Sequence, residues 1–156
     1  MLGAMSQYEV TVIVDSAFAE QIAESGLEEQ ANRVLTVEQV APGSELSVFL
    51  TDDETVRDLN HRFRDVDEPT DVLSFGLADG SAFATPPDSA NQVGEVVISY
   101  PKAFQQAQEA GHDVELEVLH LLTHGVLHIL GYDHEVPDDA RKMHAKEESL
   151  LEGWSH

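Results

Sequence analysis

The stretch HGVLHILGYDH, which begins at His124, constrains the fold of this chain more than any other. It places histidines at His124, His128 and His134, so the offsets from the first are four and ten. If Val114–Leu130 is a helix, the first two imidazoles lie one turn apart on the same face. Gly131 can end that helix in the left-handed conformation, which glycine adopts at little cost. The chain then turns back, and the third imidazole can join the other two.

This arrangement of imidazoles predicts a metal centre. Neutral imidazole suits Zn²⁺, and three protein ligands leave a fourth position open for water, as in catalytic rather than structural zinc sites. We therefore predict one zinc ion per chain, bound by His124, His128 and His134. Nickel and copper also accept imidazole ligands, so the three histidines do not select among these metals.

The residue after the first histidine separates this motif from that of the zinc proteases. Their long signature has the same histidine spacing, but a glutamate general base stands where this chain has Gly125. A protease needs such a base to carry a proton to the leaving amine, whereas an alkoxide leaving group is less demanding. The substitution argues against peptide hydrolysis and is more compatible with cleavage of a phosphodiester.

The size and composition of the chain indicate one folded domain over residues 1–156, with residues 1–7 expected to be disordered. The chain is 42% hydrophobic and has no cysteine, which excludes disulfides and thiolate metal ligands. The longest apolar-rich run, Val118–Leu130, is too short to span a bilayer, and we see no signal peptide. We expect a cytoplasmic protein with no membrane partner.

The charge of the chain is strongly negative, with 8 Lys and Arg against 30 Asp and Glu and a net charge of −22. Repulsion of this size disfavours polyanionic partners. Arg57, Arg62 and Arg64 form a local exception, with three basic residues within eight positions. Arginines on an exposed helix usually pair with nearby acids such as Asp58, and that is the plainer interpretation.

The pattern along the chain predicts the order β-α-β-α-β-β-α-α-α. Strands are expected at Tyr8–Val14, Glu45–Leu50, Val72–Phe75 and Gly94–Ser99, and helices from Asp15 or Ser16 to Leu35, over Asp52–Phe63, from Pro101 to Gly111, over Val114–Leu130 and from Pro137 onward. A long loop is expected over Leu77–Val93. We predict an α+β fold, a single layered domain in which about five helices pack on a four-stranded mixed sheet. The helix with the metal ligands should be its buried centre, and the last helix should turn Glu147 and Glu148 outward.

Three elements in a fixed order resemble a known family. They are Leu59-Asn-X-X-Phe63-Arg64, PTDVLSF at Pro69–Phe75, and the histidine stretch. Together they are similar to the YbeY family of bacterial rRNA maturation factors, described as metal-dependent single-strand endoribonucleases. The similarity extends from about Leu46 to Leu151, with Gly76 where the family commonly has Pro and Glu95 where Asp is common.

The resemblance implies a function and a set of site residues. It implies that His124, His128 and His134 bind zinc and that Arg64 acts with them in catalysis. It also implies that the chain cleaves single-stranded or precursor rRNA, in small-subunit rRNA 3′ end processing and ribosome quality control. The implied partners are the small ribosomal subunit and its proteins, and no DNA is expected.

Two other functions remain open from the sequence alone. One is a non-catalytic ribosome-assembly factor with a structural zinc, because a net charge of −22 suits basic ribosomal proteins better than naked RNA. The other is a minimal peptidase, which the residue at position 125 opposes. Asp71 and Asp133 are candidate bases or partners of the ligands, although a turn or cap role fits each of them as well.

Overall fold

The computed structural model describes residues 8–76, 92–132 and 137–151. Its strands are β1 (Glu9–Val14), β2 (Glu45–Thr51), β3 (Val72–Gly76) and β4 (Gln92–Ser99). Its helices are η2, a short 3-10 helix (Ser16–Phe18), α1 (Glu24–Val37), α2 (Asp53–Arg64), α3 (Tyr100–Ala110), α4 (Val114–Ile129) and α5 (Pro137–Leu150). The predicted order and the α+β class are confirmed. Residues 1–7, expected to be disordered, lie outside the described residues, as do positions 77–91 of the loop expected over Leu77–Val93. The last two positions of that expected loop, Gln92 and Val93, belong instead to β4, where Gln92 is aligned with Glu45 of β2.

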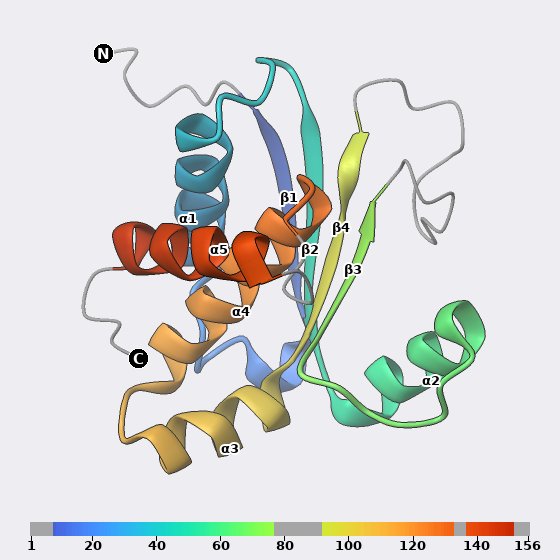
Figure 1. The fold of residues 1–156 in the computed structure, drawn as a ribbon. Coiled ribbons are helices and arrows are strands. Elements are labelled where there is room, and N and C mark those ends of the chain that lie inside the picture. Colours follow the sequence, from blue (N-terminus) through green and yellow to red (C-terminus); the bar gives the residue numbers. More distant parts are fainter. Residues whose placement is uncertain (1–7, 77–91, 133–136, 152–156) are drawn as a thin grey trace.

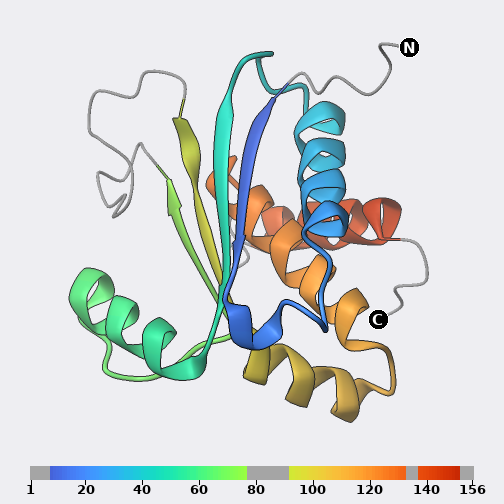
Figure 2. The ribbon, with the colours of Figure 1, turned by 180° about the vertical axis from the view of Figure 1, so that it is seen from behind.

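The four strands form one mixed sheet in the order β1-β2-β4-β3. β1, β2 and β4 run parallel, and β3 is antiparallel to β4. Because side chains alternate along a strand, the aligned residues Val12, Val48 and Val96 lie on one face of the sheet. Figures 1 and 2 show α1 and α4 on one side of the sheet and α2 on the other.

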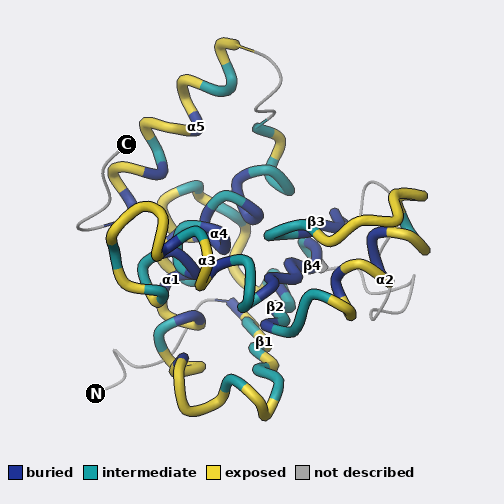
Figure 3. Tube along the Cα trace, turned by 90° about the horizontal axis from the view of Figure 1, so that it is seen from below, coloured by how far each residue is buried: buried dark blue, intermediate teal, exposed yellow. Residues whose placement is uncertain are grey.

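Helix α4 lies at the centre of the molecule. It packs against β3, β4, α1, α3 and α5, and its residues Val118, Leu122 and Val126 are fully buried. In Figure 3 the buried parts of the chain gather where α1 and α4 meet the strands. The predicted buried central helix is confirmed. In the part of the chain that the structure describes, no helix has the length and apolar character needed to cross a membrane.

The first helix differs from its prediction, because it begins at Glu24 rather than at Asp15 or Ser16. The Asp15 carboxylate accepts a hydrogen bond from the Ala17 backbone N–H at 3.0 Å, only two residues along the chain. This contact closes the short η2 turn instead of capping a longer helix. By contrast, Asp52 caps α2 as the sequence pattern indicates, accepting from the Thr55 backbone N–H at 2.7 Å.

Candidate functional site

A pocket of about 410 Å³ lies between α4, β3 and the end of α2. Its walls are formed by Arg64, Thr70, Asp71, Val72, Leu73, Ser74, His124 and His128. The structure thus brings two of the predicted ligands together with the predicted arginine, which is sixty positions away from His124 in the sequence. The third predicted ligand, His134, lies outside the described residues, as does Asp133. Within residues 8–76, 92–132 and 137–151, no three His, Asp or Glu side chains form a group able to hold a metal.

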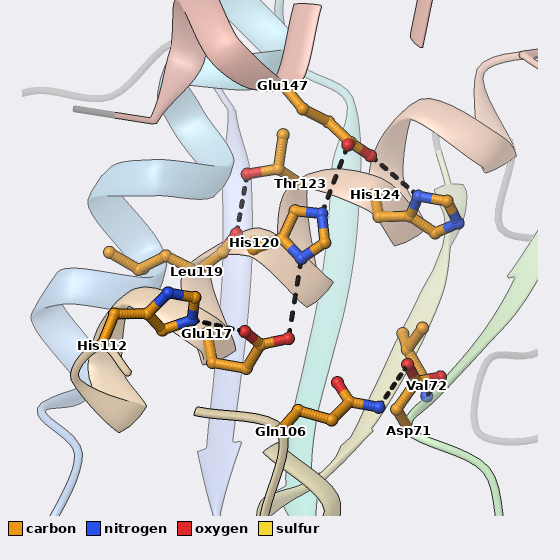
Figure 4. A network of polar contacts seen from close by, with 10 residues as sticks. All are labelled: Asp71, Val72, Gln106, His112, Glu117, Leu119, His120, Thr123, His124 and Glu147. Atoms are coloured by element: carbon orange, nitrogen blue, oxygen red, sulfur yellow. Dashed lines mark hydrogen bonds and ion pairs between the residues drawn. The ribbon is translucent and has the colours of Figure 1, made fainter. Parts of the chain in front are cut away.

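The imidazoles of His124 and His128 are each held through the same ring atom. Nδ1 of His124 is 2.8 Å from a carboxylate oxygen of Glu147, and Nδ1 of His128 is 3.2 Å from the backbone carbonyl of Tyr132. Carbonyl and carboxylate oxygens accept hydrogen bonds, so both Nδ1 atoms are donors. In Figure 4 the other ring nitrogen of His124, Nε2, points away from Glu147. Imidazoles held in this way fit a site where Nε2 binds a metal.

The turn after α4 is fixed by its own contacts. Gly131 has φ 115°, the left-handed conformation expected from the sequence. The hydroxyl of Tyr132 donates to Glu38 at 2.9 Å, and the ammonium of Lys146 forms an ion pair with the other oxygen of that carboxylate, also at 2.9 Å. The carbonyl that receives the His128 hydrogen bond is therefore anchored to both α1 and α5.

Arg64 differs from the two arginines before it on α2. Arg57 and Arg62 form exposed ion pairs with Asp67 and Asp58, at 2.9 and 3.4 Å, as isolated surface arginines are expected to do. The Arg64 guanidinium donates instead to the backbone carbonyl of Ser74 on β3. It also lies 5.2 Å from the centre of the Phe75 ring, which supports the flat face of the cation. A permanent positive charge is thus fixed in the wall of the pocket.

Gly125 lies at the closest approach between α4 and the sheet. A Cβ atom at this position would come within 2.9 Å of Val96 Cγ1 and 3.0 Å of Ser74 Oγ. The glycine therefore has a packing role, and the position has no room for the glutamate that zinc proteases carry there. This geometry adds a steric reason to disfavour the peptidase alternative.

The prediction that Glu147 points outward is wrong. Its side chain is 2% exposed and lies between two histidines of α4, as Figure 4 shows. One carboxylate oxygen is 2.8 Å from His124 Nδ1 and the other is 3.2 Å from His120 Nε2. Burial alone would raise the pKa of Glu147, but the hydrogen bonds from these two imidazoles outweigh it and lower the pKa to about 2. The group is a carboxylate at any physiological pH.

The polar network continues away from the pocket through Glu117. This buried carboxylate lies 3.7 Å from His120 Nδ1 and 2.6 Å from His112 Nε2. Burial favours neutral His120, yet the carboxylates of Glu117 and Glu147 on its two sides outweigh burial and raise its pKa to about 9. Charges of alternating sign thus run from Glu117 through His120 to Glu147 on α5, and the opposite charge beside each one compensates its burial.

Part of this network has a signal in the sequence that our prediction did not use. His120 precedes His124 by four positions, so three histidines share one face of α4. Glu147 follows Met143 by four positions and precedes Leu150 by three, which places it on the apolar face of α5. An acid among buried apolar residues indicates a polar partner, although the sequence does not identify which one.

Asp71 lines the pocket but is held by neighbouring groups. Its carboxylate accepts hydrogen bonds from the Val72 backbone N–H at 2.8 Å and from the Gln106 side chain at 3.1 Å. The Thr70 hydroxyl lies 3.3 Å away, within reach of the same carboxylate. These contacts join the start of β3 to α3. They favour a structural role for Asp71 over the role of a base or a partner of the metal ligands.

Comparisons with known proteins agree on one family. The sequence matches the family described as Endoribonuclease YbeY over residues 12–155. A protein named Endoribonuclease YbeY from Dehalococcoides mccartyi is 44% identical over 134 residues, which cover 81% of this chain and 84% of the relative. One from a Roseiflexus species is 46% identical over 140 residues, which cover 88% of this chain and 82% of the relative.

A solved structure shares the fold. The solution structure of TM1509 from Thermotoga maritima matches with a TM-score of 0.59 and 24% identity, over 92% of this chain and 87% of that chain. The family match extends over most of the sequence, including the pocket residues on α2, β3 and α4. This chain therefore belongs to the endoribonuclease YbeY family.

Proposed function

We propose that the chain is a zinc-dependent endoribonuclease that cleaves single-stranded precursor rRNA in the cytoplasm. Its role in this proposal is maturation of the small-subunit rRNA 3′ end and ribosome quality control. The names of the relatives support the nuclease activity. The observation that carries the proposal is the pocket itself, in which a fixed arginine lies opposite two imidazoles held through Nδ1.

The proposed metal ligands are His124, His128 and His134. The first two fit zinc by their chemistry, because a neutral imidazole with its proton on Nδ1 offers the Nε2 lone pair to a metal. The third, His134, comes three positions after Gly131, whose left-handed conformation lies just beyond the end of α4. When bound, zinc in such a site lowers the pKa of a water molecule to about 7 and polarises a phosphoryl oxygen.

Arg64 supplies the second element of the proposed mechanism. Cleavage of a phosphodiester adds negative charge to the non-bridging oxygens, and a planar cation held in place stabilises that charge without having to reorganise. The contacts with Ser74 and Phe75 restrict the guanidinium before substrate binds. This local positive charge also attracts one phosphate of the RNA, which offsets part of the repulsion between the RNA and a protein with a net charge of −22.

The test is cleavage of a precursor small-subunit rRNA 3′ end by zinc-loaded protein. We expect cleavage by the parent, none by His124→Ala, and a loss of about 100- to 1,000-fold in Arg64→Ala. Arg62→Ala is the matched control, because that arginine lies on the same helix but pairs with Asp58 on the surface. All proteins should be purified identically, since a contaminating nuclease would cleave equally in each sample. Equal cleavage by the parent and His124→Ala would contradict the proposal.

A second candidate function is a non-catalytic ribosome-assembly factor with a structural zinc. The strong negative charge favours it, because an acidic surface attracts basic ribosomal proteins more readily than RNA. In this case zinc removal should lower the melting temperature, and no RNA should be cleaved. Co-sedimentation of the parent with small subunits, without cleavage of their precursor rRNA, would favour this function over the first.

A further inference from the structure

The carboxylate of Glu147 is deeply buried and contacts His124, a residue of the pocket wall. It comes from α5, is 2% exposed, and faces His124 and His120 on α4 (Figure 4). A buried carboxylate is costly unless donors satisfy it, so its presence on the apolar face of α5 needs a reason. Neither the histidine motif nor Arg64 accounts for it.

We propose that Glu147 is a positioning residue for His124, holding the proton on Nδ1 and directing Nε2 toward the metal. This inference rests on the proposed function, because it concerns the same zinc site. Glu147 itself does not contact the metal or the substrate.

The geometry supports this role through the choice of tautomer. A neutral imidazole carries one N–H, and the carboxylate oxygen 2.8 Å from Nδ1 stabilises the form that has its proton there. That form has its lone pair on Nε2. The Tyr132 carbonyl, 3.2 Å from Nδ1 of His128, stabilises the same tautomer of that imidazole. The two proposed ligands on α4 are thus held in the same tautomer. The acceptor for His124 is charged, and a charged acceptor increases the basicity of the ligand more than a neutral carbonyl does.

His120 has a different part in this arrangement. Its spacing from His124 would allow it to be a metal ligand, but its Nε2 lies 3.2 Å from Glu147 and its Nδ1 3.7 Å from Glu117. Both ring nitrogens face carboxylates. His120 therefore holds Glu147 in position from the side opposite His124.

The position of α5 does not depend on Glu147 alone. The Gln30 side chain on α1 donates to the Thr123 hydroxyl of α4 at 2.9 Å and to the Leu150 carbonyl of α5 at 3.2 Å. These bonds fix the end of α5 against α4 one turn beyond Glu147. Substitution of the carboxylate should therefore change the state of His124 without releasing the helix.

The first test is zinc affinity, measured by competition with a chelator. We expect zinc binding to weaken about 10-fold in Glu147→Gln, whose amide oxygen can still accept, and up to about 100-fold in Glu147→Ala. Glu148→Gln is the matched control, because it removes the same charge from the next, exposed position of α5 and should leave the affinity unchanged.

The second test needs no variant and so does not depend on one folding. Nitrogen-resolved NMR of the zinc-loaded parent should show His124 bound through Nε2 with its proton on Nδ1. A purely structural role for Glu147 would affect the melting temperature of its variants but would not determine which ring nitrogen binds the metal.

Three results would overturn the inference, and they are distinguishable. Binding of His124 through Nδ1 in the parent would do so, and so would unchanged zinc affinity in both Glu147 variants. Either of these would leave the proposed zinc enzyme intact. A parent that binds no zinc at all would overturn the proposed function together with the role of Glu147.

Discussion

Replacement of Gly125 by alanine tests how closely α4 packs on the sheet. The new methyl group would lie 2.9 Å from Val96 Cγ1, 3.0 Å from Ser74 Oγ and 3.4 Å from Val72 Cγ2. Val96 is fully buried and β-branched, so its methyl group has few alternative positions. Either the valine leaves its rotamer or α4 moves away from β3 and β4.

The expected cost follows from two opposing effects. Overpacking of a core by one methyl group costs about 1–3 kcal/mol, while replacing glycine by alanine in a helix gains about 1 kcal/mol. The net effect of Gly125→Ala should be a loss of about 0–2 kcal/mol. Gly26 on α1 provides the matched control, because a Cβ there would meet no atom within 4 Å. Gly26→Ala should therefore gain up to about 1 kcal/mol, without any overpacking cost.

The assay is urea unfolding of the parent and both variants without metal, followed by circular dichroism. The free energies of unfolding of the two variants should differ by about 1–3 kcal/mol, the overpacking cost alone. In thermal unfolding, a chain of this length loses about 2–4 °C for each kcal/mol. If Gly125→Ala proves as stable as Gly26→Ala, the close contact between α4 and the sheet does not exist as described. The argument against a glutamate at this position would then fail as well.

Three further predictions concern stability. Asp52→Ala should lower the free energy of unfolding by about 1 kcal/mol at pH 7, because it removes the side-chain cap of α2. The hydrogen bonds from Thr55 lower the pKa of Asp52 below its ordinary 3.8, so this contribution is present above that pH and is lost as the pH falls through the folded pKa. The difference between variant and parent in urea should thus shrink below pH 3.8, and a constant difference would contradict the assignment. Leu122→Ala should lower the free energy of unfolding by about 2–5 kcal/mol in the same assay, because the side chain is fully buried. A loss below about 1 kcal/mol would show that the surrounding side chains fill the cavity. Zinc at about 1,000 times its dissociation constant should raise the free energy of unfolding of the parent by about 4 kcal/mol, as measured by calorimetry. A chelator should reverse this effect, and His128→Ala should abolish it.

The sequence predicts those features of the site that depend on local periodicity. The shared face of His124 and His128 follows from the helical repeat, and the left-handed turn at Gly131 follows from the properties of glycine. The pairing of Glu147 with His120 depends instead on how α5 crosses α4, which no local pattern determines. For the same reason the sequence identifies Arg64 by resemblance, but not the Ser74 carbonyl that holds it.

The strand order has a consequence for the folding kinetics of the protein. β4 lies between β2 and β3, so β3 joins the sheet only through a strand that follows it in the chain. The pocket joins β3 to His124 and His128 of α4, a helix that follows β4 in the chain, so it forms only once α4 has packed against β3. Pairing of strands that are far apart in the sequence slows folding, because long loops must close before these contacts form. A newly synthesised chain should form its helices early and its pocket late, so a partly folded chain carries no complete pocket.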